Sequence, residues 1–222
     1  MNNFTLLRPT VASVMIFGLA ACGGGGGSTT EVEVTIDPTV QTPTQTQTTD
    51  TSTAGQRAAA TALLDEWAPT NPPIYTNLSV IPTTGSAEYA GFVYGELSND
   101  SDTITDSVIG SLNLEVGFNA GGASFGGSAS GFVDEDDNDL AGNLTVSNGS
   151  LDRTGNPADD ATIGINLAGT LTDDADQDLV FGFALEGDFL GAEYNAVGGA
   201  ALGRVTVDGV DQDFDGGFIA ER

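Results

Sequence analysis

Residues 178–189 read "DLVFGFALEGDF", and their side chains alternate between apolar and small or polar. The apolar set is Leu179, Phe181, Phe183, Leu185 and Phe189. Between its members stand Gly182, Ala184, Glu186 and Asp188. A period of two is typical of a strand that buries one of its faces. The stretch therefore predicts a half-buried β-strand.

The same period recurs along the second half of the chain. It is clear in "SVIGSLNLEVGF" (107–118) and "ATIGINLAGTL" (161–171). Weaker copies cover 86–97, 123–133, 140–151, 193–207 and 216–222, and the last two are separated by a turn around 208–213. Short, turn-rich connections and glycines inside strands are typical of a barrel wall that bends sharply. We expect an all-β fold, an eight-stranded antiparallel barrel over 85–222.

The alternation permits two barrels of opposite polarity. A soluble barrel points Leu114 and Phe183 inward, whereas an outer-membrane barrel turns them toward lipid. Aromatic residues are too few for two interfacial girdles, and an interior holding Glu115 and Glu186 would lack arginine partners. We therefore predict the soluble barrel, and an integral outer-membrane barrel with a structural role is the alternative.

The N-terminus has the pattern of an export signal. Residues 1–10 carry one base, Arg8, and no acid, and 11–21 are almost entirely apolar. This pattern predicts a signal peptide over 1–21. Its end, Leu19-Ala20-Ala21-Cys22, resembles the bacterial lipobox. The resemblance implies that the Cys22 sulfur carries a diacylglyceryl group, and Gly23 favours the outer membrane.

Two segments separate the anchor from the barrel. Residues 22–55 are rich in glycine, threonine and glutamine, which predicts a disordered, lipid-anchored linker. Residues 56–84 are expected to form one short helix followed by a proline-rich connector.

The helix is predicted over 56–68. Thr53 and Gln56 fit a capping box, and Ala59, Leu63 and Trp67 share one face. The expected role is to cover one end of the barrel, and a partner-binding helix is the alternative.

Composition excludes several classes of function. The chain has 32 acidic residues, five arginines, no lysine and no histidine, and its net charge is −27. Such a charge argues against nucleic acid and against docking on anionic lipid through basic patches. Without histidine, and with its only cysteine acylated, the chain cannot build a Ser-His-Asp triad or a Cys/His metal site. We expect a monomer that is not an enzyme, has no cofactor, and binds an unidentified protein or small ligand.

Two acidic stretches are candidates for a binding face. Asp134, Asp136 and Asn138 alternate as in a calcium loop. That loop would need glycine at its sixth position and glutamate at its twelfth, which is Thr145 here, so a solvated turn is the favoured interpretation. The second stretch holds Asp173, Asp174 and Asp176.

These stretches belong to a larger group of acids, which we call the acidic end. In an up-and-down barrel the connections after strands one, three, five and seven meet at one end. They hold sixteen of the 32 acids: Asp100, Asp102, Asp106, Asp134, Glu135, Asp136, Asp137, Asp139, Asp173, Asp174, Asp176, Asp178, Asp208, Asp211, Asp213 and Asp215. We expect this end to point away from the linker and the membrane. Solubility explains the group without a ligand, and a docking face for a cationic partner is the alternative.

Three stretches resemble a known family. They are "AEYAGFVYGE" (87–96), "GDFLGAEYNAVGGAALG" (187–203) and "GGFIAER" (216–222). They resemble the opening and closing strands of the barrel domain of transferrin-binding-protein-B-like lipoproteins. The resemblance implies a surface lipoprotein that binds transferrin, a haem carrier or a complement regulator. This chain has one barrel where transferrin binders have two lobes, and its last strand departs from the family pattern.

Overall fold

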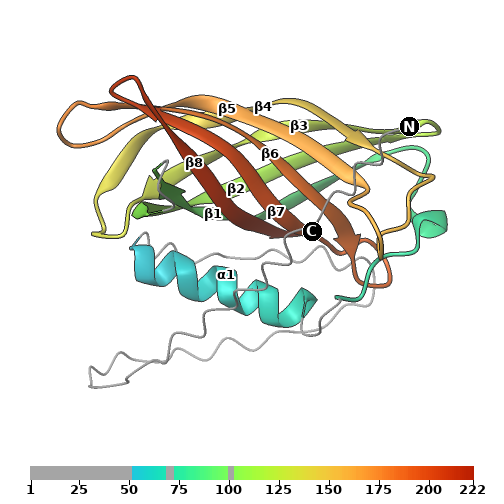
Figure 1. The fold of residues 1–222 in the computed structure, drawn as a ribbon. Coiled ribbons are helices and arrows are strands. Elements are labelled where there is room, and N and C mark those ends of the chain that lie inside the picture. Colours follow the sequence, from blue (N-terminus) through green and yellow to red (C-terminus); the bar gives the residue numbers. More distant parts are fainter. Residues whose placement is uncertain (1–51, 69–72, 100–102) are drawn as a thin grey trace, which may run out of the picture. The chain divides into compact units, whose positions relative to one another are not determined.

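Eight strands pair in sequence order, each antiparallel to the next, and the last pairs with the first to close a barrel (Figure 1). The computed structural model describes residues 52–68, 73–99 and 103–222. The strands are β1 (Ser86–Ser98), β2 (Ile104–Asn119), β3 (Gly122–Val133), β4 (Asp139–Leu151), β5 (Ile163–Thr172), β6 (Asp178–Leu190), β7 (Ala196–Val207) and β8 (Val210–Glu221). The predicted eight-stranded antiparallel barrel is confirmed.

Strand β8 begins six residues earlier than the sequence pattern suggests. Asp208 and Gly209 have φ angles of 53° and 79°, and they alone connect Val207 to Val210. Positive φ at both central residues is the mark of a tight hairpin turn of type I′. Asp211 and the acids after it therefore belong to a strand and not to a loop.

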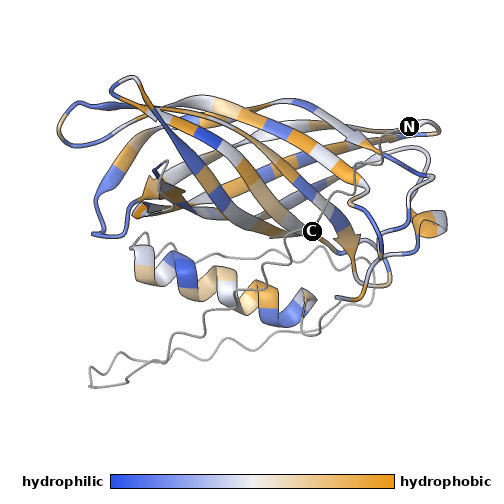
Figure 2. Cartoon of the chain, in the orientation of Figure 1, coloured by the Kyte–Doolittle hydropathy of each residue, from blue (hydrophilic) through white to orange (hydrophobic). Residues whose placement is uncertain are grey.

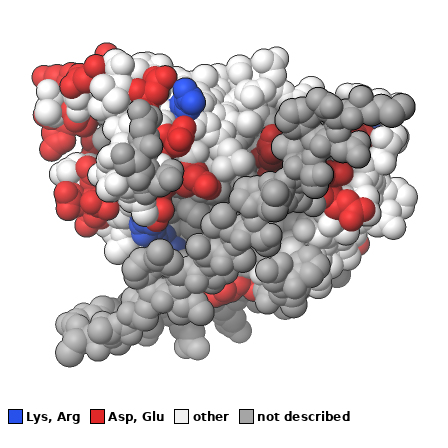
Figure 3. Space-filling model, in the orientation of Figure 1, with Lys and Arg blue, Asp and Glu red and all other residues white. Residues whose placement is uncertain are grey.

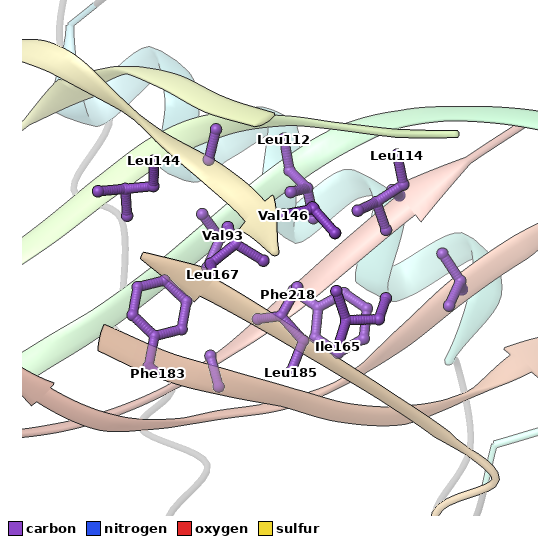
Figure 4. Packing of buried hydrophobic residues seen from close by; sticks show 14 of the residues in the cluster. Val93, Leu112, Leu114, Leu144, Val146, Ile165, Leu167, Phe183, Leu185 and Phe218 are labelled. Carbon is purple, nitrogen blue, oxygen red and sulfur yellow. The ribbon is translucent and has the colours of Figure 1, made fainter. Parts of the chain in front are cut away.

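The interior of the barrel is filled by apolar side chains from all eight strands. Figure 4 shows part of this cluster. Leu114 and Phe183 are 1% and 4% exposed, so both point inward as predicted. The rings of Phe183 and Phe214 stack with their centroids 4.7 Å apart. Between the inward residues of β2, Asn113 and Glu115 face outward and are exposed, and Figure 2 shows this alternation along the strands. The wall has the polarity of a barrel that faces water.

Two glycines make room for this packing. A Cβ at Gly110 would lie 2.6 Å from the Phe132 ring, and one at Gly95 would lie 2.4 Å from the Phe214 ring. Both distances are far below van der Waals contact, so the rings occupy space that any other residue would take. Gly95 and Gly110 are thus part of the core packing.

Helix α1 (Thr53–Trp67) begins earlier than predicted, so the folded part starts within the segment 22–55 that was expected to be linker. Its N-cap is Ser52, whose Oγ accepts a hydrogen bond of 3.1 Å from Gly55 N. The predicted pairing of Thr53 with Gln56 is wrong. Gln56 is buried, and its Nε2 donates to Gly131 O of β3 at 2.9 Å.

The helix lies along the outside of the wall and not over an end (Figure 1). Ala60 and Leu63 pack against Phe92 and Ile109, which point outward from β1 and β2. The predicted end cover is wrong because these outward residues are apolar and need to be shielded from water. Ala59, expected on the packed face, is exposed, and its neighbour Ala60 takes that place.

A short 3₁₀ helix, η1 (Leu78–Val80), lies between α1 and β1. The predicted signal peptide, the lipobox residues Leu19, Ala20, Ala21 and Cys22, and nearly all of the predicted linker lie outside the described residues. Within the described ranges, no helix has the length and apolarity to cross a membrane.

Candidate functional site

The turns β1–β2, β3–β4, β5–β6 and β7–β8 share one end of the barrel because the strands run up and down in sequence order. Acidic side chains gather at this end, at the left of Figure 3, where the β5–β6 and β7–β8 turns lie in Figure 1. The structure therefore brings Asp134, Asp136 and Asn138 to the same end as the acids of 173–176. Asp100 and Asp102 lie outside the described residues.

The turn between β3 and β4 is organised by one carboxylate. Asp134 Oδ1 accepts hydrogen bonds from Asp136 N at 2.9 Å and from Asn138 N at 2.8 Å. Its Oδ2 accepts from Asn138 Nδ2 at 2.8 Å. Asp137 has a φ of 66°, a left-handed conformation that allows a short hairpin loop to close. Asp134 and Asn138 therefore form the turn.

The turn between β5 and β6 repeats this arrangement. Asp173 Oδ1 accepts from Ala175 N at 2.9 Å and from Gln177 N at 2.8 Å. Asp176 has a φ of 60°, as Asp137 has in the first turn. Residues 134–138 and 173–177 are thus two copies of one hairpin turn, in which an aspartate side chain replaces part of the backbone hydrogen bonding.

This geometry bears on the calcium-loop alternative. Both oxygens of Asp134 already accept hydrogen bonds from their own loop. Among residues 52–68, 73–99 and 103–222, no three acidic, histidine or cysteine side chains are placed to hold a metal ion. The acids of these turns that remain exposed include Glu135, Asp136 and Asp174. They offer negative charge at the surface but not a ligand cage.

Asp106 stands out among the acids of this end. It lies in β2, and its half-buried carboxyl accepts a hydrogen bond of 2.6 Å from Ser107 N. Burial raises the pKa of Asp106, and the nearby charges of Asp134 and Glu135 act in the same direction. Neighbouring carboxylates of this end therefore disfavour the ionised form of Asp106.

The outer wall beside these turns carries a small ion cluster. Arg204 on β7 lies 3.5 Å from Asp211 and 3.7 Å from Asp213, both on β8. All three side chains are more than half exposed. Ion pairs in such surroundings contribute little to stability.

Helix α1 begins at the acidic end. Thr53 N donates to Asp137 Oδ1 at 2.7 Å, and Thr53 Oγ1 donates to Asp134 O. The N-terminus of a helix favours a nearby carboxylate because its free N–H groups carry partial positive charge. The expectation that the acidic end points away from the linker is therefore wrong, because α1, which follows the predicted linker, begins at this end. Sequence patterns missed this contact because it joins residues 84 positions apart.

A depression on the wall of β1, β2 and β3 has no counterpart in the sequence patterns. Its volume is about 370 Å³, and Glu88, Glu115 and Phe125 are among the residues that line it. Glu88 and Glu115 stand directly opposite each other in the β1–β2 pairing. Like charges in this position are unfavourable.

Comparisons with protein-family models, curated proteins and solved structures gave no match to this chain. The likeness of residues 87–96, 187–203 and 216–222 to transferrin-binding-protein-B-like lipoproteins therefore stays a prediction.

Proposed function

We propose that the chain is an outer-membrane lipoprotein, anchored through Cys22, whose barrel is a rigid module that binds a partner at its outer surface. The filled interior carries this proposal. Leu144, Leu167 and Phe218 are each no more than 1% exposed and belong to the apolar cluster inside the wall (Figure 4). Since the chain's own side chains occupy the interior, binding falls to the outer wall and the two ends.

Support for the anchor comes from Leu19, Ala20, Ala21 and Cys22, directly behind an apolar segment. Gly23 favours the outer membrane. The likeness to transferrin-binding-protein-B-like lipoproteins favours the cell surface over the periplasmic face. It also favours a role in iron or haem acquisition, or in contact with a host or the environment.

For the binding face we propose the acidic end and a cationic protein partner. Glu135, Asp136 and Asp174 are exposed there, and the turns are held by Asp134 and Asp173 instead. A rigid array of exposed carboxylates attracts a basic surface and accelerates its association at low salt.

The alternative function, an integral outer-membrane barrel, calls for an apolar outer wall. Asn113, Glu115 and Asp213 point outward and are exposed, which disfavours it. No enzymatic activity and no cofactor are part of the proposal.

The anchor is tested with Cys22→Ser in cells fed labelled palmitate. We expect the variant to lose the label and to move from the membrane to the soluble fraction. Labelling at another residue, or unchanged retention in the membrane, would contradict the anchor. Protease treatment of intact cells then separates the cell surface from the periplasmic face.

The binding face is tested by cross-linking on intact cells with the triple variant Glu135→Gln/Asp136→Asn/Asp174→Asn. The matched control, Glu88→Gln/Glu115→Gln/Glu193→Gln, removes the same charge away from these turns. We expect the first variant alone to lose cross-linked partners. Equal loss in both variants would mean that net charge, and not this face, recruits them.

A further inference from the structure

The pairing between β3 and β4 covers only about half of the two strands. It runs from Val133↔Asp139 to Ser128↔Thr145. Both strands continue beyond this point, β3 back to Gly122 and β4 on to Leu151, within the described residues and without further paired positions. We call residues 122–127 and 146–151 the seam. Strands β6 and β7, in contrast, pair without interruption from Leu179↔Val207 to Leu190↔Ala196.

Both strands are irregular where the ladder stops. Gly127 has a φ of 124°, and a Cβ there would lie 2.1 Å from Asn113 O. On β4, the register with β5 shifts between Val146 and Asn148, so Ser147 is an extra residue. Irregularities of this kind turn backbone N–H and C=O groups away from a partner strand. Two of them at the same level explain why pairing ends here.

Side chains close the seam in place of a ladder. Arg153, two residues after β4, donates from Nη2 to Gly122 O at 3.2 Å, across to the first residue of β3. The same guanidinium donates to Ile81 O at 3.0 Å and to Pro82 O. Further along, Phe125 covers Gly149, where a Cβ would lie 2.6 Å from the Phe125 Cβ.

This closure is weaker than a ladder would be. The Nε of Arg153 is buried without a hydrogen-bond partner, which costs free energy in the closed state. Phe125 is only half-buried, whereas Phe132 and Phe181 on paired parts of the wall are 1% and 2% exposed. Segments with few backbone pairs open with less free energy than the rest of a protein.

We infer that the seam is a latch in the barrel wall, held shut by Arg153 and Phe125, which opens while the other strands stay paired. The seam borders the core, since Val146 belongs to the same apolar cluster as Ile165 and Leu167. Phe125 packs against this cluster. Opening the latch exposes apolar interior without unfolding the barrel. It gives an otherwise filled barrel one defined place where its interior can be reached.

Hydrogen exchange of the full chain, followed by mass spectrometry of peptides, tests the latch. About half of the amides of 123–127 and 146–150 point across the seam and not into the β2–β3 and β4–β5 ladders. This half should exchange at least about tenfold faster than amides of the β6–β7 ladder, because local opening is enough to release them. In Arg153→Gln, loss of the bond to Gly122 should raise the exchange rate of the seam amides about tenfold above that of the unaltered chain. The exchange rate of the β6–β7 amides should not change. Binding of an apolar dye such as anilinonaphthalene sulfonate should rise in parallel.

Arg204→Gln is the matched control, since it removes an arginine from the exposed outer wall and should change neither readout. If Arg153→Gln does not fold, Phe125→Ala takes its place, because it removes the cover from Gly149 and keeps the arginine. Protection of seam amides equal to that of β6–β7 in the unaltered chain would overturn the inference. So would a variant that raises exchange in all strands equally.

Discussion

The two ends of the barrel are held together in different ways. At the acidic end the turns are short, and a carboxylate such as Asp173 bonds to the backbone of its own turn. The opposite end, which we call the loop end, consists of 119–122, 152–162 and 191–195, and it has buried or half-buried side-chain bonds that join distant segments. There Tyr89 Oη donates to Tyr194 O at 2.9 Å, and Thr162 Oγ1 donates to Asp188 at 2.6 Å.

This difference indicates where a mutation should lower the stability of the protein most. A bond within one turn stabilises a few residues, and water can replace it when it is lost. A buried bond between distant segments leaves an unsatisfied group in both when it is broken. Mutations at the loop end should therefore cost more than equivalent mutations at the acidic end.

A charged substitution in the interior, between the two ends, should lower the stability of the protein most. Phe183→Asp places a carboxylate without a partner among buried side chains, which costs about 5 kcal/mol or more and should unfold the barrel. Thr170→Asp, on the exposed side of β5, is the control and should leave the fold intact. Circular dichroism during heating measures both. A folded Phe183→Asp protein would mean that the wall has the opposite polarity.

At the loop end, Thr162→Val should destabilise the protein by about 2 kcal/mol, because it leaves the buried Asp188 carboxylate with one donor fewer. Thr206→Val removes the same kind of bond, to Asp211 at 2.7 Å, from the exposed outer wall at the acidic end. Its cost should stay below about 0.5 kcal/mol. Urea unfolding of both variants compares them directly, and equal costs would break the distinction between the ends.

At the acidic end, Asp173→Ala should cost about 1 kcal/mol, because two backbone N–H groups of the turn lose their acceptor. Asp174→Ala removes the same charge one residue away. It should leave stability unchanged or raise it slightly, since repulsion among the acids falls. If both alanine variants lose stability equally, charge and not turn geometry is what Asp173 contributes.

Lowering the pH should stabilise the fold through one carboxyl group at each end. Burial raises the pKa of Asp188 at the loop end, and Thr162 opposes this only in part. Burial likewise raises the pKa of Asp106 at the acidic end. The ordinary pKa of both groups is 3.8, so above this pH the unfolded chain releases protons that the folded protein still holds. The free energy of unfolding therefore falls as the pH rises from 3.8 through the raised pKa values. Melting temperatures should be higher near pH 3.8 than at pH 7, with a smaller difference in Asp188→Asn.

Added salt should change the stability least, when its effect is counted for each acidic residue. Exposed carboxylates repel one another, and the Debye length falls from about 30 Å at 0.01 M to about 3 Å at 1 M salt. The melting temperature should therefore rise with sodium chloride. Calcium at equal ionic strength should add nothing more, and Asp134→Asn/Asp136→Asn is the control. A calcium increment that disappears in this double variant would show coordination by the β3–β4 turn.

The period of two predicted much of the fold because it is a local property of each strand. Leu114 and Phe183 lie inside as their spacing indicates, and Glu115 lies outside. The strand order placed the acidic turns at one end. Breaks in the alternation are informative as well. Adjacent apolar pairs such as Phe92-Val93 and Phe218-Ile219 mark strands that are buried on both faces.

By itself, then, the sequence determined the class of fold, the inward and outward faces of the wall, and the grouping of the acids. Only the tertiary structure decided where α1 lies, which carboxylates form turns, and where the wall lacks a ladder. Gln56 meets Gly131, Thr53 meets Asp137, and Arg153 meets Gly122 only after the barrel has closed. The physical reason is how far apart along the sequence the interacting residues lie. Alternation arises from neighbours along one strand, whereas these bonds need residues at least 31 positions apart to be placed by all the strands between them.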